Sequence, residues 1–253
     1  MDGDAFVDWV AALEKRHLAD LRLPEVTRAL RALSSAYVER RQALQHGVAL
    51  NSAGKRAAFA LFYGPLHFLT TRHVLGSLNA VSRVPDTILD LGCGSGAAGA
   101  AWALECDRRP RVIGIDRHPA TMEEARWTYR QLGIQGTARQ GDIARIRPPR
   151  GELAIIAAYV LNEVPSATRE AAWKVILTAA RRGARVLVLE PIARALTPWW
   201  EDMTKDVTLA GGRADEWRFS VELPSIVQAL DRSAGLNHRE VTARSLYIPF
   251  SCS

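Results

Sequence analysis

Four glycines follow an apolar run in the stretch ILDLGCGSGAAG, which spans residues 88–99. The last three form a G-x-G-x-x-G pattern, which lets a backbone turn sharply and approach the phosphates of a dinucleotide closely. Asp90, however, lies two residues before Gly92, where the expected strand ends. A carboxylate at that position would repel a pyrophosphate and would attract a ligand with an ammonium group. The stretch therefore predicts an adenosine-bearing cofactor and favours an ammonium ligand over a nicotinamide or flavin dinucleotide.

Two further acids follow the next expected strands. Asp116 ends the run RVIGID about 20 residues after Gly96, which is the spacing of an acid that binds ribose hydroxyls. Asp142 follows the third strand, where it could accept a hydrogen bond from an adenine amino group while Ile143 packs on the ring. Ligands of open α/β sheets bind beyond the carboxyl ends of the strands, so the three acids are expected to share one site.

This order of glycine loop, ribose acid and adenine-side aspartate resembles that of the class I SAM-dependent methyltransferases. Their D-x-G-x-G-x-G loop matches residues 90–96, and the resemblance covers about residues 87–253. It implies an enzyme that transfers a methyl group from S-adenosyl-L-methionine (SAM). The residues expected to bind this cofactor are Asp90, Gly92, Cys93, Gly94, Gly96, Asp116, Arg117, Asp142, Ile143 and Tyr159.

The fourth expected strand leads into AAYVLNEVP, residues 157–165, a junction that lies beside the methyl group in enzymes of this family. The ring of Tyr159 could flank the sulfonium, or could pack under the first helix instead. Asn162 and Glu163 are the predicted catalytic pair, because they are the polar residues nearest the methyl position and Glu163 could accept a proton or hold an amine. The alternative is that Asn162 caps the next helix and Glu163 lies in its first turn. The segment lacks the paired acids of a metal-dependent catechol-type enzyme, so no metal is expected.

The segments AYVLNE and VLVLEP, with Pro65 and Phe68 in FYGPLHF, also resemble a narrower family. This is the methyltransferase-like family that works on the small subunit of the mitochondrial ribosome, with its bacterial relatives. Its mitochondrial members carry the cysteines of an iron–sulfur cluster, whereas this chain has only three cysteines, so the resemblance is to a cluster-free bacterial branch. It implies methylation of RNA of the ribosomal kind. The alternatives are a small-molecule N- or O-methyltransferase and a SAM-binding ribosome assembly factor without turnover.

Ring side chains in two regions are expected near the methyl acceptor. The N-terminal helices could form a lid whose rings face the cofactor, although Gly64 and Pro65 are expected to break the helix between those rings. The segment 197–219 after the fifth strand contains two adjacent tryptophans, which could cover the substrate or could anchor the segment on the sheet. The residues expected near the acceptor are therefore Tyr63 and His67 on the lid and Trp199 and Trp200 in the segment.

Short apolar runs alternate with helical stretches from residue 87 onward, which predicts βαβ units. The expected fold is α/β, with a doubly wound, mostly parallel seven-stranded Rossmann-like sheet that ends in an antiparallel hairpin within GLNHREVTARSLYIPFS. The residues before this region are predicted to be helical, with an apolar stripe from Val26 to Tyr37. A later helix is expected to begin after an N-cap at Ser52 and to end at Gly64. The expected domains are an N-terminal helical cap at 1–83 and a SAM-binding Rossmann-like methyltransferase domain at 84–253.

The composition is that of a chain with one substantial core, since 48% of its 253 residues are hydrophobic. The best apolar run, AAFALFYGPLHFL, is too short to span a membrane, and the acidic N-terminus is unlike a signal peptide. Three scattered cysteines disfavour a disulfide framework or a zinc site, so a cytoplasmic location is expected.

The net charge of +6 weakly favours a polyanionic partner. A composition rich in arginine and alanine is also typical of GC-rich genomes. Arginines in residues 139–150 include some near the carboxyl edge of the sheet, whereas those in 108–111 and 181–185 precede strands and should lie at the opposite edge. This division keeps RNA and a small-molecule acceptor nearly level as substrates, with RNA slightly ahead.

Overall fold

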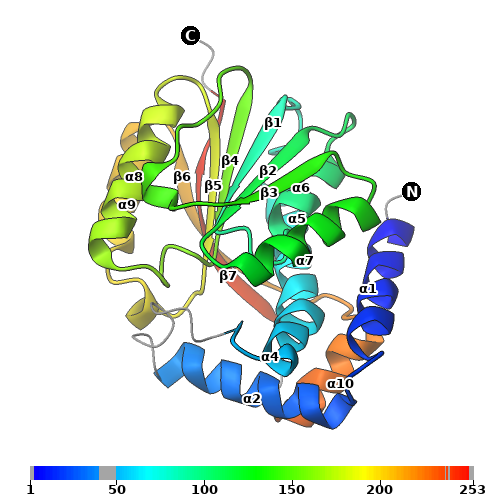
Figure 1. Cartoon of the computed structure of the whole chain (residues 1–253). Helices are drawn as coiled ribbons and strands as arrows, with labels where there is room; N and C mark the ends of the chain where they lie inside the picture. Colours follow the sequence, from blue (N-terminus) through cyan, green and yellow to red (C-terminus); the bar gives the residue numbers. More distant parts are fainter. Residues whose placement is uncertain (1–2, 40–49, 237, 239, 251–253) are drawn as a thin grey trace.

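A seven-stranded sheet forms the centre of the molecule in the computed structural model, which describes residues 3–39, 50–236, 238 and 240–250 (Figure 1). The strand order is β3-β2-β1-β4-β5-β7-β6. The first five strands along the chain pair in parallel, and β7 is antiparallel to both of its neighbours. The expected α/β, mostly parallel Rossmann-like sheet is therefore confirmed. The strands are β1 (Thr87–Leu91), β2 (Arg111–Asp116), β3 (Gly136–Gln140), β4 (Leu153–Ala158), β5 (Arg185–Glu190), β6 (Arg213–Phe219) and β7 (Val241–Ile248).

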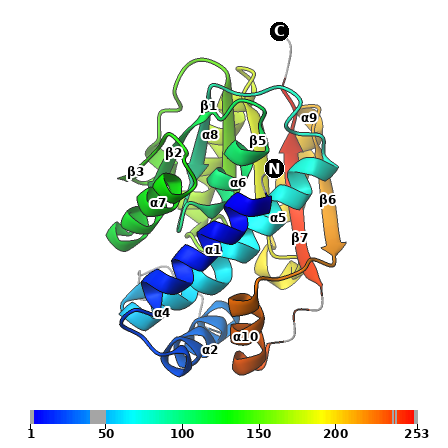
Figure 2. The same cartoon turned by 90° about the vertical axis from the view of Figure 1, so that its right-hand side faces the viewer.

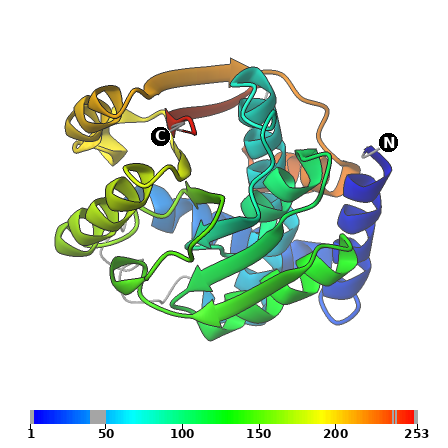
Figure 3. The same ribbon diagram turned by 90° about the horizontal axis from the view of Figure 1, so that it is seen from above.

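Helices cover both faces of the sheet, which makes it doubly wound (Figure 3). Neighbouring side chains of a strand point to opposite faces, so Ile88 of β1 joins the core on one face and Leu89 joins the core on the other. Trp102 belongs to the first core and Trp173 to the second. The helices are α6 (Ala97–Glu105) and α7 (Pro119–Gln131) on the first face, and α8 (Ser166–Ala180) and α9 (Trp200–Leu209) on the second.

The N-terminal helices pack into the first of these cores. Trp9 is fully buried, and its ring centroid lies 5.6 Å from that of Phe68. Val26 and Leu30 are also fully buried, as the apolar stripe predicted, whereas the side chain of Tyr37 lies outside the described residues. In Figure 2, the C-terminal helix α10 lies beside α2. No helix in the described ranges combines the length and apolar character needed to cross a bilayer. The helices are α1 (Gly3–His17), α2 (Leu23–Glu39), α4 (Ala53–Ala58), α5 (Gly64–Ser77) and α10 (Ser225–Ala234).

The helix does not stop at Gly64, which corrects the expected break. Ser52 caps α4 as expected, with its Oγ accepting a backbone N–H at 3.2 Å. The chain then continues through a π-helical turn, η2 (Phe59–Tyr63), directly into α5. The N–H of Gly64 donates to the carbonyl of Phe59, five residues back, and we attribute the continuity to this wider turn, which leaves room for the Pro65 ring.

The C-terminal residues do not form the expected hairpin. Among the described residues there, β7 is the only strand, and its antiparallel partner β6 comes from the segment 197–219. That segment contains both α9 and β6, and α10 separates the two paired strands along the chain. β6 is an edge strand with charged, exposed side chains, so no run of apolar residues marks it in the sequence.

Candidate active site

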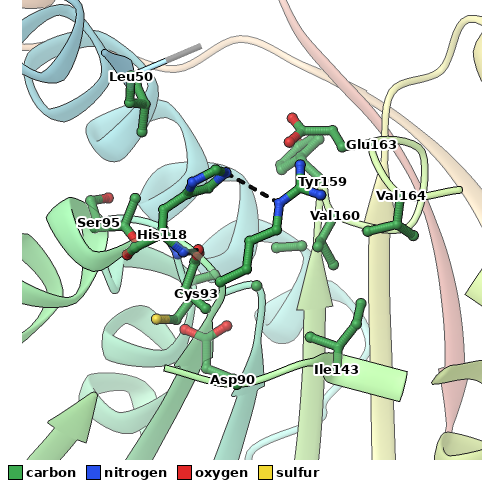
Figure 4. Close-up of a pocket in the computed structure, with 18 of the residues that line it drawn as sticks. Leu50, Asp90, Cys93, Ser95, His118, Ile143, Tyr159, Val160, Glu163 and Val164 are labelled. Carbon is green, nitrogen blue, oxygen red and sulfur yellow. Dashed lines mark hydrogen bonds between the residues drawn. The ribbon is translucent and has the colours of Figure 1, made fainter. Parts of the chain in front are cut away.

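A cavity of about 620 Å³ lies at the carboxyl ends of β1, β2 and β4, and its size suits a cofactor or small ligand. The loops after these strands form its base (Figure 4). Leu50, Phe59 and His67 line it from the N-terminal region. The structure brings together nine of the ten residues expected to bind the cofactor. They are Asp90, Gly92, Cys93, Gly94, Asp116, Arg117, Asp142, Ile143 and Tyr159.

The glycine loop fits tightly against its neighbours. Gly92 has a φ of +68°, and a Cβ added there would lie 2.3 Å from Cγ2 of Val160, so both the backbone and the space require glycine. Gly96, the one expected cofactor residue outside the lining, has a φ of +79° and precedes α6. A Cβ at Gly96 would lie 2.8 Å from the ring of Tyr129, so this glycine shapes the loop from behind.

Asp90 is buried beneath the loop, with 1% of its surface exposed. Its Oδ2 accepts the N–H of Gly99 at 3.0 Å, which ties β1 to the first turn of α6. Burial raises the pKa of Asp90 to about 7, although the bond from Gly99 opposes this shift. A cation in the cavity would attract the ionised carboxylate and would therefore lower this pKa.

Asp116 and Asp142 both use backbone N–H groups to fix their positions. Asp116 accepts the N–H of Gly94 at 3.0 Å and that of His118 at 2.9 Å. A carboxylate offers about four acceptor positions, so Asp116 has positions left for the hydroxyl groups of a ligand. Asp142 accepts a backbone N–H two residues on at 2.9 Å, and this fixes the short turn η3 (Ile143–Arg145), whose first residue lines the cavity.

Tyr159 follows β4 in a left-handed conformation, with a φ of +58°. Such a conformation costs a residue with a side chain about 1–2 kcal/mol. The Tyr159 N–H donates to the carbonyl of Leu189 at 2.7 Å, and its ring stacks on that of His67 with centroids 4.2 Å apart. Burial lowers the pKa of His67 to about 4, so the imidazole is neutral near pH 7 and keeps one nitrogen that can accept a hydrogen bond.

Glu163 lines the cavity, whereas Asn162 does not. Glu190, at the end of β5, is fully buried, and its Oε1 accepts the N–H groups of Leu161 at 2.9 Å and Asn162 at 3.2 Å. Burial raises the pKa of Glu163 to about 8 and the pKa of Glu190 well above its usual value. Because α8 begins at Ser166, Asn162 is not its capping residue. Glu190 thus holds the segment that presents Glu163 to the cavity.

The other residues expected near the acceptor lie outside the lining. Trp200 is 8% exposed in the first turn of α9, with the guanidinium carbon of Arg244 5.0 Å from its ring centroid. Trp199 packs against the same core and has Arg169 at 5.1 Å. The two tryptophans therefore anchor α9 to the sheet. Tyr63 also does not line the cavity, although its ring centroid is 6.1 Å from that of His67, which does.

Several residues that line the cavity were not predicted from the sequence. His118 lies two residues after Asp116, and the Nε of Arg117 donates to its Nε2 at 3.2 Å, drawn as the dashed line in Figure 4. Among the described residues, no three histidine, cysteine or acidic side chains gather as a metal site. The lining residues that were not expected include Phe59, Ser95, His118, Thr121, Gln140 and Val160.

The donor set fits SAM better than a dinucleotide. Asp90 is an acid buried under the glycine loop, where a pyrophosphate would be repelled and an ammonium group attracted. Asp116 has free acceptor positions for ribose hydroxyls, and Asp142 with Ile143 suits the edge and face of an adenine ring.

Residues 88–183 match a family model described as a methyltransferase domain. A curated relative is the ribosomal RNA small subunit methyltransferase C of Actinobacillus pleuropneumoniae (serotype 5b, strain L20), which is 26% identical over 129 residues. That match covers 51% of this chain and 39% of the relative, so this chain spans well under half of the relative's length.

Several solved structures are similar to this chain at low sequence identity. The [4+2]-cyclase SpnF has a TM-score of 0.50 and 18% identity over 73% of this chain and 81% of its own. A SAM-dependent methyltransferase from Aquifex aeolicus has a TM-score of 0.49 and 14% identity over 72% of this chain and 90% of its own. The magnesium protoporphyrin IX methyltransferase of Synechocystis PCC 6803, solved with bound SAM, has a TM-score of 0.48 and 19% identity over 92% of this chain and 99% of its own. The matched methyltransferase domain and the ordered acids of the cavity together support a class I SAM-dependent methyltransferase with S-adenosyl-L-methionine as its cofactor.

Proposed function

We propose that this protein is a SAM-dependent methyltransferase that modifies RNA of the ribosomal kind. The observation that carries the proposal is the flat stack of His67 and Tyr159 in the cavity lining, with Glu163 in the same lining. A flat aromatic surface with nearby hydrogen-bonding groups is how proteins hold an unstacked base of single-stranded RNA. The name of the relative from Actinobacillus pleuropneumoniae, a ribosomal RNA methyltransferase, supports the same substrate class.

The residues of the cavity account for the chemistry that such a reaction needs. The cofactor supplies a methyl group already activated on a sulfonium, so positioning of the acceptor provides much of the rate. His67 is neutral near pH 7 and can accept a hydrogen bond from an acceptor N–H or O–H, although its pKa of about 4 makes it a weak base. Glu163 can act as a base once ionised, or can donate a hydrogen bond while protonated below its pKa of about 8. We propose these two residues, with Asn162 in a supporting position, as the catalytic group.

Transfer of a labelled methyl group tests this function. The protein would be incubated with methyl-tritiated SAM and bacterial small-subunit ribosomal RNA, both as a free transcript and in assembled small subunits. We expect label that ribonuclease releases and protease does not. Asp116→Ala should lower the incorporation strongly, whereas Asp107→Ala, at an exposed acid outside the cavity, should leave it unchanged. Absence of label from both forms of RNA, in a protein that binds SAM, would contradict the proposal.

A small-molecule acceptor is the second candidate, because the N-terminal helices contribute Phe59 and His67 to the cavity lining. Such a cover suits a small acceptor that is enclosed on binding. The position of Arg108 also favours a small-molecule acceptor. This arginine pairs with Asp86 at 3.5 Å beside the start of the parallel strands, away from the cavity, where it could not bind RNA at the site. Label transferred to solvent-extractable compounds of an RNA-free cell extract would support this candidate over RNA.

The division into a cap at 1–83 and a methyltransferase domain at 84–253 remains a proposal. Its support is that the helices of the first region contribute to the cavity, while the acids and glycines come from the second. Both regions share one hydrophobic core, to which Trp9 and Trp102 belong. We therefore propose that the cap is a fixed part of the site and does not fold as a separate unit.

A further inference from the structure

A second hollow, of about 560 Å³, lies between α8 and the connection from η3 to β4. Four basic residues line it, and each is exposed: Arg147, Arg150, Lys174 and Arg182. Within the described part of the chain, no acidic residue lines it. Two of the basic residues, Arg147 and Arg150, belong to the arginine cluster at residues 139–150, and neither lines the cofactor cavity.

The four cations have no ion pair and no side-chain hydrogen bond among the described residues, unlike other cations of the surface. Arg83 pairs with Glu152, and Lys205 pairs with Asp202 at 2.9 Å. Like charges around one hollow repel one another, and an anion bound between them would remove this repulsion. The hollow is therefore a place where negative charge would be attracted.

The connection after β3 and the helix α8 each contribute residues to both the hollow and the cofactor cavity. The connection after β3 lines the cavity with residues 140–143 and the hollow with residues 146–151. Likewise, Thr168 at the start of α8 lines the cavity and Lys174 lines the hollow. At 1.5 Å and about 100° per residue, these two positions are about 9 Å apart along the helix and about 240° apart around it. Leu153, which begins β4, and Ala184, just before β5, also line the hollow, so it reaches the sheet edge opposite the cavity. A chain molecule would therefore have to run along α8 from one edge of the sheet to the other to contact both places.

The floor of the hollow indicates which part of a nucleic acid it would contact. It consists of aliphatic and proline side chains, among them Ile146, Pro148, Pro149 and Val175. No aromatic ring lines it, so it offers no surface of the kind on which single-stranded bases stack. Arginine and lysine side chains without a stacking surface suit phosphate groups, which position a strand without reading its sequence.

We propose that this hollow binds the phosphates of an RNA strand whose target nucleotide enters the cofactor cavity. The proposal rests on RNA being the methyl acceptor. It assigns Arg147, Arg150, Lys174 and Arg182 to substrate binding and leaves SAM binding to the separate cavity.

Salt-dependent binding to bacterial small-subunit ribosomal RNA tests the proposal in the full-length protein. The double variant Lys174→Gln with Arg182→Gln removes two cations of the hollow. The matched control, Arg218→Gln with Arg232→Gln, removes two exposed cations that line neither hollow nor cavity. Both variants should bind SAM as the wild type does in calorimetry, because none of the four residues lines the cofactor cavity.

We expect the slope of log affinity on log salt to become less negative by about 1.4 in the hollow variant, since each single-strand phosphate contact contributes about 0.7. Over the decade from 1 M to 0.1 M salt, this corresponds to about 25-fold weaker binding at 0.1 M. The control should keep the wild-type slope.

Two results would overturn the proposal, and they are distinguishable. If the wild type does not bind RNA even at low salt, the RNA function fails and this proposal fails with it. If the wild type binds RNA and the hollow variant binds as the control does, the hollow is not the RNA site although the function stands. Binding of inorganic tripolyphosphate that is lost in the hollow variant, without any change in RNA binding, would identify a site for small anions and would also contradict the proposal.

Discussion

Ionisation of Asp90 should control how cofactor binding depends on pH. Asp90 has a pKa of about 7 in the free protein, because it is buried, so at lower pH most molecules carry a neutral carboxyl group. If the ammonium group of SAM binds against the carboxylate, binding must first remove that proton. The apparent affinity then falls by a factor of 1 + 10^(pKa − pH), which is about 33 at pH 5.5 and about 2 at pH 7.0. We therefore expect the affinity to rise about 16-fold between these two pH values.

Calorimetric titration with SAM in buffers of different ionisation enthalpy measures both the affinity and the protons released. At pH 5.5, close to one proton should leave the complex for each SAM that binds. Asp90→Asn can still accept the N–H of Gly99 but cannot ionise, so its affinity should be lower at pH 7.0 and nearly constant over the range. The rise should end near pH 8, where the α-amino group of SAM itself loses its proton. A wild-type affinity that does not change between pH 5.5 and 7.0 would refute the reasoning.

Two further predictions concern the framework of the site. Glu190→Ala leaves one buried and one part-buried N–H group without an acceptor and should lower the free energy of unfolding in urea by about 2–6 kcal/mol. Because burial raises the pKa of Glu190 above 4.5, the folded protein keeps a proton there that the unfolded chain has lost, so stability falls as the pH rises above 4.5. Asp90 and Glu163 add to this fall, so Glu190→Gln should show a shallower fall than the wild type, by at most about 1.4 kcal/mol per pH unit. Gly92→Ala combines a φ of +68° with a clash against Val160 and should cost about 2–4 kcal/mol and weaken SAM binding. Gly211→Ala has a similar φ of +76° but open space, and should cost only about 1–2 kcal/mol, so equal losses in the two variants would mean that the clash is relieved.

The features that could be predicted from the sequence are those that a pattern of a few neighbouring residues indicates. β1 and β2 are apolar runs that end near an acid, and parallel strands bring such ends to one edge. Asp90 and Asp116 therefore line one cavity, as expected, although many residues separate them along the chain. β6 was not predicted, because an exposed edge strand carries charged side chains and lacks an apolar run. The continuous helix through Gly64 was not predicted either, because a glycine–proline pair usually ends a helix.

Other parts of the site depend on contacts between distant segments. His67 reaches Tyr159 only because α5 passes near the end of β4, and no local pattern encodes that crossing. Trp200 looks like a ligand-binding ring in the sequence, yet Arg244 from β7 covers it within the fold. Glu190 could have been found, since an acid that ends the apolar strand VLVLE must be buried and must have a hydrogen-bonding partner.

Calorimetry with SAM, S-adenosylhomocysteine and NAD tests the central claim most directly, namely that this cavity holds SAM with Asp116 on the ribose. We predict binding of the first two ligands and no measurable binding of NAD. Asp116→Ala should weaken SAM binding by about 1.5–3 kcal/mol, the value of a hydrogen bond to a charged group, which corresponds to about 12- to 160-fold. Asp107→Ala, at an exposed acid outside the cavity, should bind SAM as the wild type does. Binding of NAD in place of SAM, or an unchanged SAM affinity in Asp116→Ala, would contradict the account.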